Sequence, residues 1–262
     1  MLTKSPFYIV VLLFLVAIAI LFFDSHHSLF LTINNAGSHI ADKVWIFSSI
    51  FGNKAFVLIL VLLVFWHKPQ LLRATLIAGL IAILISFSIT PLIALARPPA
   101  VLDPVSFHLI GERLTGGSFP SAHAMGTFAI LGSIAFYFKN RFLSLLIFML
   151  SSFVGLSYIM LGVYWPIDIL IGAALGWVCA WLGVYLISAN LWRDNDIWNY
   201  LNYVIYLLIA VYLVWAGDYN NDDLSWAIKA MAILGVVVAI WSLLWLKKGG
   251  NKEPISVAGW LS

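Results

Sequence analysis

The chain of 262 residues is 63% hydrophobic and only 10% charged, and its mean hydropathy is +1.02. Soluble globular proteins carry about a quarter of charged residues, so this composition excludes a soluble domain and indicates an integral membrane protein. The net charge of +3 is small, and it is informative only through the loops in which the charges lie.

Eight transmembrane helices are expected, because a helix of about 20 apolar residues crosses a bilayer and the runs lack the alternation of barrel strands. They are expected at residues 7–23, 45–66, 71–96, 122–138, 143–163, 166–187, 201–217 and 225–246. The first run follows Lys4, as a signal peptide would, but no small-x-small cleavage pattern follows it, and we interpret it as a retained helix. The expected fold class is therefore all-α, a polytopic transmembrane helix bundle.

The basic residues divide unequally between the two sides of this bundle. Nine fall on one side: Lys4, Lys68, Arg73, Lys139, Arg141, Arg193, Lys247, Lys248 and Lys252. Five fall on the other: Lys43, Lys54, Arg97, Arg113 and Lys229. Because cytoplasmic loops carry the excess of Lys and Arg, both termini are expected in the cytoplasm. The loops 24–44, 97–121, 163–166 and 217–223 are then expected on the outer side.

Three polar stretches are expected to meet on that outer side: 94-ALARPP-99, 117-GSFPSAHAMG-126 and 157-SYIMLGVYWPID-168. Arg97 ends the third helix, because the two prolines after it cannot continue a helix. Ser121 is placed to cap the fourth helix, with His123 beside it, so that backbone N–H groups point outward. An arginine, a helix start, a histidine and the carboxylate of Asp168 together suit a phosphate group.

Each of these residues also has a purely structural interpretation. Arg97 could simply extend to the membrane interface without binding a ligand, as isolated arginines at helix ends do. Ser121 could be only a cap, and His123 only a polar residue in a hydrated loop. Asp168 stands third in its helix, where a carboxylate favours the helix dipole without any catalytic role.

The position of Asp168 favours a functional interpretation over that structural one. Asp168, Gly172, Gly176 and Ala180 recur every four residues, which places the carboxylate at the head of a stripe of small residues. Such stripes pack against neighbouring helices in membrane proteins. A carboxylate that faces the interior of a transmembrane bundle is a functional candidate.

The order and spacing of these residues resemble the signature of the type 2 phosphatidic acid phosphatase and vanadium haloperoxidase family. That signature runs Lys-x6-Arg-Pro, Pro-Ser-Gly-His and Ser-Arg-x5-His-x3-Asp, and this chain has Arg-Pro, Pro-Ser-x-His and Ser-x6-Tyr-x3-Asp. The context 161-LGVYWPIDILIGAALGW-177 is also similar. The resemblance implies a six-helix lipid-phosphatase-like core plus two C-terminal helices. Residues 1–69 then hold the first two helices, 70–187 the three motifs, and 188–262 the last two helices and a short cytoplasmic tail.

In that family the third-motif His attacks phosphorus, the Asp of that motif orients it, and the second-motif His protonates the leaving oxygen. The Lys, both Arg residues and the Ser hold the phosphoryl oxygens. Four positions match the family: Arg97, Ser121, His123 and Asp168. Four depart from it, with Thr90 in place of the Lys, Ala122 of the Gly, Tyr158 of the third-motif Arg and Tyr164 of the attacking His.

The resemblance therefore implies candidate catalytic residues His123, Asp168 and Tyr164, and candidate phosphate-binding residues Arg97, Ser121, Ala122, Tyr158 and Thr90. Loss of two cations from a dry site is expected to cost several kcal/mol of transition-state stabilisation. A phenol is a poor nucleophile at neutral pH unless a base activates it, and Asp168 or His123 is a possible base. His108, Glu112 and Arg113 in the outer loop are further possible replacements for the missing groups.

Three functions are compatible with this signature. The first is a protein of the inner (plasma) membrane that binds a lipid phosphate or polyprenyl diphosphate on the periplasmic or extracellular side, with weak or absent hydrolysis. The second is an active lipid-phosphate phosphatase with rearranged catalytic groups, and the third is a non-catalytic scaffold. The resemblance implies that no metal is needed, since the family's phosphatases need none, and no cofactor is expected. The pair His26-His27 lacks a third ligand at suitable spacing. Nothing indicates a nucleic-acid partner, and the oligomeric state is left open.

Overall fold

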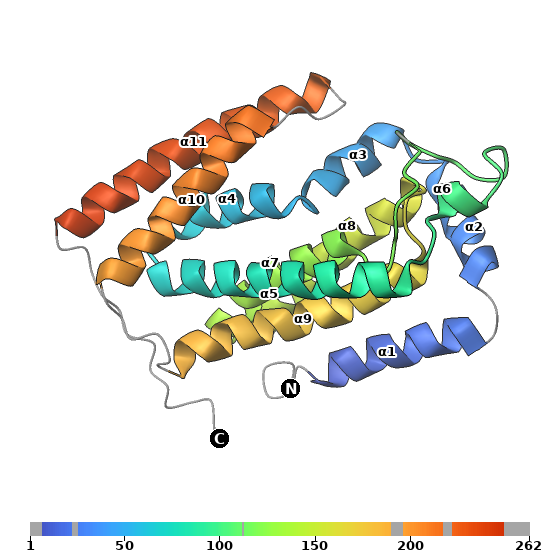
Figure 1. The fold of residues 1–262 in the computed structure, drawn as a ribbon, viewed down its shortest axis with the longest axis horizontal. Coiled ribbons are helices and arrows are strands. Elements are labelled where there is room, and N and C mark those ends of the chain that lie inside the picture. The colour runs from blue at the N-terminus through green and yellow to red at the C-terminus, as the bar shows by residue number, and fades with distance from the viewer. Residues whose placement is uncertain (1–6, 23–25, 112, 190–195, 217–221, 249–262) are drawn as a thin grey trace.

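The computed structural model describes residues 7–22, 26–111, 113–189, 196–216 and 222–248, which form a bundle of helices (Figure 1). The helices are α1 Phe7–Phe22, α2 His26–Gly37, α3 Asp42–Ile50, α4 Lys54–Phe65, α5 Pro69–Ile93, α6 Pro98–Val101, α7 Ala122–Phe138, α8 Arg141–Met160, α9 Pro166–Ser188, α10 Asp196–Ala216 and α11 Asp222–Lys247. The all-α class expected from composition is confirmed, since strands are absent from these described ranges.

Five helices are long and apolar enough to cross a membrane, namely α5, α8, α9, α10 and α11. Two bent pairs, α1 with α2 and α3 with α4, raise the number of candidate spans to as many as seven. Helix α7, with 17 residues, is shorter but lies in the middle of the bundle. The chain is therefore a multi-pass membrane protein.

Two expectations from the sequence are wrong in detail. Residues 24–44, expected as a loop, contain all of α2 and the first residues of α3. The span expected at 45–66 is broken into α3 and α4, which are bent by 68° relative to one another. The break follows from local chemistry, because the Asn53 side chain accepts a hydrogen bond from Phe56 N at 3.1 Å and so starts a new helix.

Several other helix ends follow directly from the sequence. Helices α5 and α9 begin with Pro69 and Pro166, which fit the first turn because its N–H groups have no partner within the helix. Ser121 caps α7 and Asn140 caps α8, each by accepting a hydrogen bond from a backbone N–H of the first turn. The expected cap at Ser121 is confirmed.

The centre of the bundle is formed by α5, α7 and α9, which pack closely against one another. A Cβ atom at Gly172 would lie 2.7 Å from Ser121 O, and one at Gly176 would collide with Met125 O. These glycines therefore let the backbones of α7 and α9 approach, as the stripe of small residues predicted. The close packing brings the first turns of α7 and α9 together.

The C-terminal helices α10 and α11 form a hairpin that packs against α4 (Figure 1). Two buried tyrosines of α10 fix its position: Tyr203 donates a hydrogen bond to Trp66 O, and the Tyr206 hydroxyl lies 2.7 Å from the Thr75 hydroxyl. The two added helices are thus joined to the core by specific polar contacts as well as by apolar packing.

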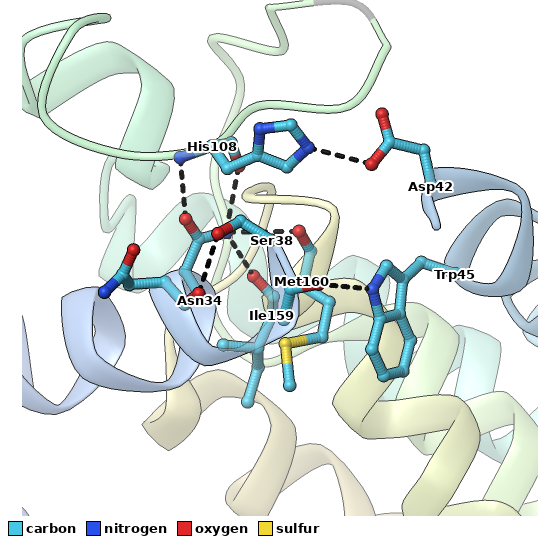
Figure 2. Close-up of polar contacts among 9 residues, drawn as sticks. Asn34, Ser38, Asp42, Trp45, His108, Ile159 and Met160 are labelled. Carbon is cyan, nitrogen blue, oxygen red and sulfur yellow. Dashed lines mark hydrogen bonds and ion pairs between the residues drawn. The ribbon is translucent and has the colours of Figure 1, made fainter. Parts of the chain in front are cut away.

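Helices α2 and α6 and the links around them gather at one end of the bundle (Figure 1). Asn34 of α2 holds this end together, since its amide nitrogen donates to His108 O, Ile159 O and Met160 O, and its oxygen accepts from His108 N at 2.7 Å (Figure 2). The His108 ring also contacts Asp42 at 2.9 Å. We call Asn34, His108 and Asp42 the loop anchor, because they attach the segment between α6 and α7 to α2, α3 and α8.

Candidate functional site

A cavity of about 680 Å³ opens between α4, α5 and the first turn of α7. It is lined by Lys54, Ile83, Ser86, Phe87, Thr90, Pro91, Ala94, Arg97, Gly117, Ser118, Pro120, Ala122 and Tyr164. Four of the candidate site residues are in this lining, namely Thr90, Arg97, Ala122 and Tyr164. We call this space the head-group cavity.

Arg97 lies in the extended link between α5 and α6 and turns toward the bundle. Its guanidinium donates to Val163 O and to the Tyr164 hydroxyl, both at 3.1 Å, and its Cζ lies 4.3 Å from the centroid of the Tyr164 ring. The side chain is half-buried. This inward geometry differs from an arginine that only extends to the interface, and the cation–π contact adds about 0.5–2 kcal/mol.

The Tyr164 hydroxyl is the point at which the site's polar groups meet. His123 Nδ1 lies 3.1 Å from it, and Tyr164 is only 2% exposed. The phenol oxygen accepts a hydrogen bond from Arg97 and has its own hydrogen available for His123. Tyr164, which the family resemblance aligns with the attacking histidine, thus contacts both Arg97 and His123.

Tyr158 lies behind this group rather than in the cavity wall. Its hydroxyl donates to Ser49 O at 2.8 Å, in the last turn of α3, and its ring lies 4.7 Å from the His123 ring. A Cβ atom at Gly52 would collide with this tyrosine, so the Tyr158 ring packs against the backbone at the break between α3 and α4. Tyr158 therefore supports the position of His123, and its hydroxyl is directed toward α3 instead of the cavity.

Asp168 and Ser121 join the starts of α9 and α7. Asp168 Oδ2 accepts from Trp165 N at 3.0 Å, and Ser121 Oγ accepts from Ala124 N at 3.3 Å. Ser121 N in turn donates to Asp168 O at 3.0 Å. Both side chains are buried and serve as helix caps. The Asp168 carboxylate also lies close enough to Arg97 to attract its guanidinium electrostatically.

The loop residues proposed as substitutes for the missing groups point elsewhere. His108 contacts Asp42, and Arg113 Nε donates to Pro99 O, so neither lines the head-group cavity. Glu112 lies outside the described residues.

His26 and His27 lie against the ring of Trp165, with ring centroids 4.4 and 4.9 Å from it. Within the described part of the chain, His, Cys, Asp and Glu side chains do not form a group of three suited to a metal ion.

The sequence motifs do not identify three polar residues of the cavity wall, namely Lys54, Ser86 and Ser118. Lys54 had been treated only as one of the charges of an outer loop, yet it is the first residue of α4 and lines the cavity together with Arg97. Ser118 also lines the cavity, and its backbone N–H donates to Leu95 O at 2.8 Å. The only signal for Lys54 was its position directly after Gly52-Asn53, a pair that favours a break in a helix.

Residues 70–193 match the family model of the PAP2 superfamily. Over 113 residues the chain is 27% identical to lipid A 4'-phosphatase from Bacteroides thetaiotaomicron, which corresponds to 41% of this chain and 50% of that protein. Over 150 residues it is 29% identical to undecaprenyl-diphosphatase BcrC from Bacillus subtilis, corresponding to 55% of this chain and 75% of that protein. The match to the first of these relatives thus spans only half of its length.

Two solved structures share the fold. The crystal structure of Aquifex aeolicus LpxE superposes with a TM-score of 0.51 at 22% identity, over 61% of this chain and 94% of that one. The first transmembrane PAP2 type phosphatidylglycerolphosphate phosphatase from Bacillus subtilis gives a TM-score of 0.54 at 21% identity, over 73% of this chain and all of that one. At these identities the comparison establishes the architecture of the bundle.

Proposed function

Because this chain belongs through residues 70–193 to the PAP2-type membrane lipid phosphatases, we propose that it binds a lipid phosphate or diphosphate and hydrolyses it slowly or not at all. The observation that carries the proposal is the contact between Arg97 and Tyr164. The cation of the first motif is present and faces the cavity, while a phenol occupies the place of the attacking imidazole.

Anion binding is supported by the wall of the head-group cavity. Arg97 offers a planar group of N–H donors, which suits phosphoryl oxygens. Ala122, the first residue of α7, also lines the cavity, so the positive end of a helix dipole is close by. These features favour an anionic head group over a neutral one.

Slow hydrolysis is supported by two replacements. A phenol attacks phosphorus poorly at neutral pH without strong activation. Tyr158 stands at the family's third-motif arginine, and its hydroxyl donates to Ser49 O, so this position supplies no cation to the transition state. Phosphoryl transfer depends mainly on positioning and on neutralising charge at the equatorial oxygens, so both losses act on the chemical step.

The ligand class follows from the chemistry shared by the named relatives. Their names refer to lipid A, undecaprenyl diphosphate and phosphatidylglycerolphosphate, each a phosphate or diphosphate on a lipid. We place the site on the outer face of the plasma membrane, because the excess of Lys and Arg lies on the opposite side.

Binding by the purified chain in detergent tests the proposal. We expect phosphatidic acid to bind more tightly than diacylglycerol, which lacks the phosphate. Arg97→Ala should weaken phosphatidic acid about 10- to 100-fold, as expected for a charge-assisted hydrogen bond. Lys43→Ala, at an exposed position of α3, is the matched control and should change affinity less than about twofold. Equal affinity for both lipids would contradict the proposal.

A second candidate function, slow turnover through Tyr164, is favoured by the 3.1 Å contact with His123. In that reaction the phenol oxygen would attack phosphorus and its proton would pass to His123 Nδ1. The lipid alkoxide would leave and take up a proton, and water would then hydrolyse the phosphotyrosine. Phosphate release that is present in the wild type and absent in Tyr164→Phe would establish this function in place of the first.

A further inference from the structure

Lys54 occupies an unusual place for a lysine, at a break inside an apolar span. Helix α3 ends at Ile50 and α4 begins at Lys54, with a bend of 68° between them. Asn53 caps α4, and this cap fixes the position of Lys54 as the first residue of the helix. A charged residue within a membrane bundle is costly, so it is expected to have a functional partner.

The Lys54 side chain packs against α7 at Gly126. A Cβ atom at Gly126 would lie 2.5 Å from Lys54 Cγ, 2.8 Å from Cε and 2.9 Å from Cδ. The aliphatic stem therefore crosses α7 at Gly126, where α7 has no side chain in the way. Gly126 is three residues after His123, and the charges of Lys54 and Arg97 both act on the His123 ring. The lysine thus reaches the site along the first turns of α7, whereas Arg97 reaches it from the link between α5 and α6.

Among the described residues, the Lys54 ammonium group has no carboxylate as a charge partner. Lys54 lines the head-group cavity with Thr90 and Arg97, and it is half-buried. Its ammonium group makes no hydrogen bond or ion pair with any residue of the described ranges. Within the described residues Asp168 acts electrostatically on Arg97, whereas Lys54 has no paired carboxylate. Two cations on one cavity favour an anionic ligand, because the ligand's charge offsets the cost of bringing the cations together.

A second cavity adjoins the first at Lys54. This space of about 430 Å³ is lined by Lys54, Arg73, Trp198, Asn202 and otherwise apolar residues of α4, α5, α7 and α10, and Lys54 and Ile83 belong to the linings of both cavities. A ligand that uses both spaces has an anionic head and a hydrocarbon chain. This is the chemistry of a lipid phosphate.

We propose that Lys54 binds the phosphoryl oxygens of the lipid ligand opposite Arg97, and so supplies a cation that Thr90 and Tyr158 do not provide. The inference rests on the proposed function and assigns a second binding residue to the same site. It explains why α4 starts within the bundle and why α7 has glycine at position 126.

The test measures the affinity of the purified full chain in detergent for phosphatidic acid. Lys54→Met keeps the length of the side chain and removes its charge, and we expect it to weaken binding at least about tenfold. Lys43→Met, at the exposed lysine of α3, is the control and should leave affinity within about twofold. Lys54→Met combined with Thr90→Lys should regain affinity, because Thr90 lines the same cavity and the charge is only moved.

Inorganic phosphate, used as a competitor, separates a contact with the phosphoryl group from a contact with the rest of the lipid. We expect millimolar phosphate to displace phosphatidic acid from the wild type and to bind more weakly to Lys54→Met. Unchanged competition by phosphate in Lys54→Met would contradict the proposed contact.

The outcomes also separate the two proposals. Wild-type affinity of Lys54→Met, with binding weakened by Arg97→Ala, would overturn the role of Lys54 and leave the proposed function intact. Equal wild-type affinity for phosphatidic acid and diacylglycerol would overturn both.

Discussion

The head-group cavity and the loop anchor lie toward the same end of the bundle, but their polar groups are partnered differently. In the loop anchor, Asn34 makes hydrogen bonds through both its oxygen and its nitrogen, and His108 contacts the Asp42 carboxylate (Figure 2). In the cavity, Arg97 contacts a carbonyl and a phenol, and Lys54 faces a space without a paired carboxylate in the described structure.

This difference distinguishes polar side chains that stabilise the fold from polar side chains that bind a ligand. Polar groups that satisfy one another hold elements together and have no need of a ligand. Cations whose charge is left uncompensated raise the energy of the empty protein, and a ligand lowers it. Substitutions in the loop anchor should therefore reduce stability, whereas substitutions of Lys54 should reduce binding.

The largest expected effect concerns the side of the membrane on which both regions lie. Val105, in the segment held by the loop anchor, is 93% exposed, and Arg141 is exposed at the start of α8. The single cysteine, Cys179, is buried and gives little background. In intact cells an impermeant maleimide should label Val105→Cys and leave Arg141→Cys unlabelled. The reverse pattern would place the cavity on the cytoplasmic side.

Turnover should respond next most strongly, because under the proposed function Arg97 and His123 still lie where they could act on a phosphoryl group. Thr90→Lys, Tyr158→Arg and Tyr164→His together should raise phosphate release from phosphatidic acid by on the order of a hundredfold. Tyr164→His alone should give little, since groups that act as a unit do not add. Measurement on purified, folded protein decides this, and a folded triple variant without a gain would show that the remaining residues no longer hold a productive geometry.

Removal of Asn34 should lower stability rather than binding chemistry. Asn34→Leu removes its hydrogen bonds to three carbonyls and to the His108 N–H, and we expect a loss of about 3 kcal/mol in the free energy of unfolding. Thermal melting in detergent measures the loss. Asn35→Leu, at the exposed neighbouring asparagine, is the control and should change it by less than about 0.5 kcal/mol. A similar melting temperature for both variants would show that the loop anchor is not structural.

The smallest expected effect is that of Lys54→Met on the empty protein. Because the ammonium lacks a charge partner in the described chain, its removal should change the stability by about 0.5 kcal/mol or less, or raise it slightly. The melting temperature without lipid should stay close to that of the wild type, while stabilisation by added phosphatidic acid should fall. A large drop without lipid would assign Lys54 to the structure and remove the contrast with the loop anchor.

The sequence predicts the helices well, because long apolar runs and local caps depend on neighbouring residues. The cap at Ser121 and the stripe of Gly172 and Gly176 are examples. The sequence does not predict α2, since the segment 26–37 is short and mixes polar with apolar residues. The use of Asn34 as an anchor depends on carbonyls of α8 more than a hundred residues away.

The site is predicted in part for the same reason. Motif order identifies Arg97, Tyr164 and His123, which the structure brings into contact. Motif order also assigns Tyr158 to phosphate binding, but its hydroxyl donates to Ser49 O in the last turn of α3, a contact that depends on the break between α3 and α4. Lys54 is missed because its path depends on a glycine in a different helix.

The fate of a bound lipid phosphate tests the central claim most directly. Purified protein in detergent is incubated with phosphatidic acid, and retained lipid and released phosphate are measured in the same sample. We predict that intact phosphatidic acid is recovered with the protein and that released phosphate stays below one equivalent per chain. Release of many equivalents, abolished by Tyr164→Phe, would contradict binding without efficient hydrolysis and identify the protein as a tyrosine-dependent phosphatase.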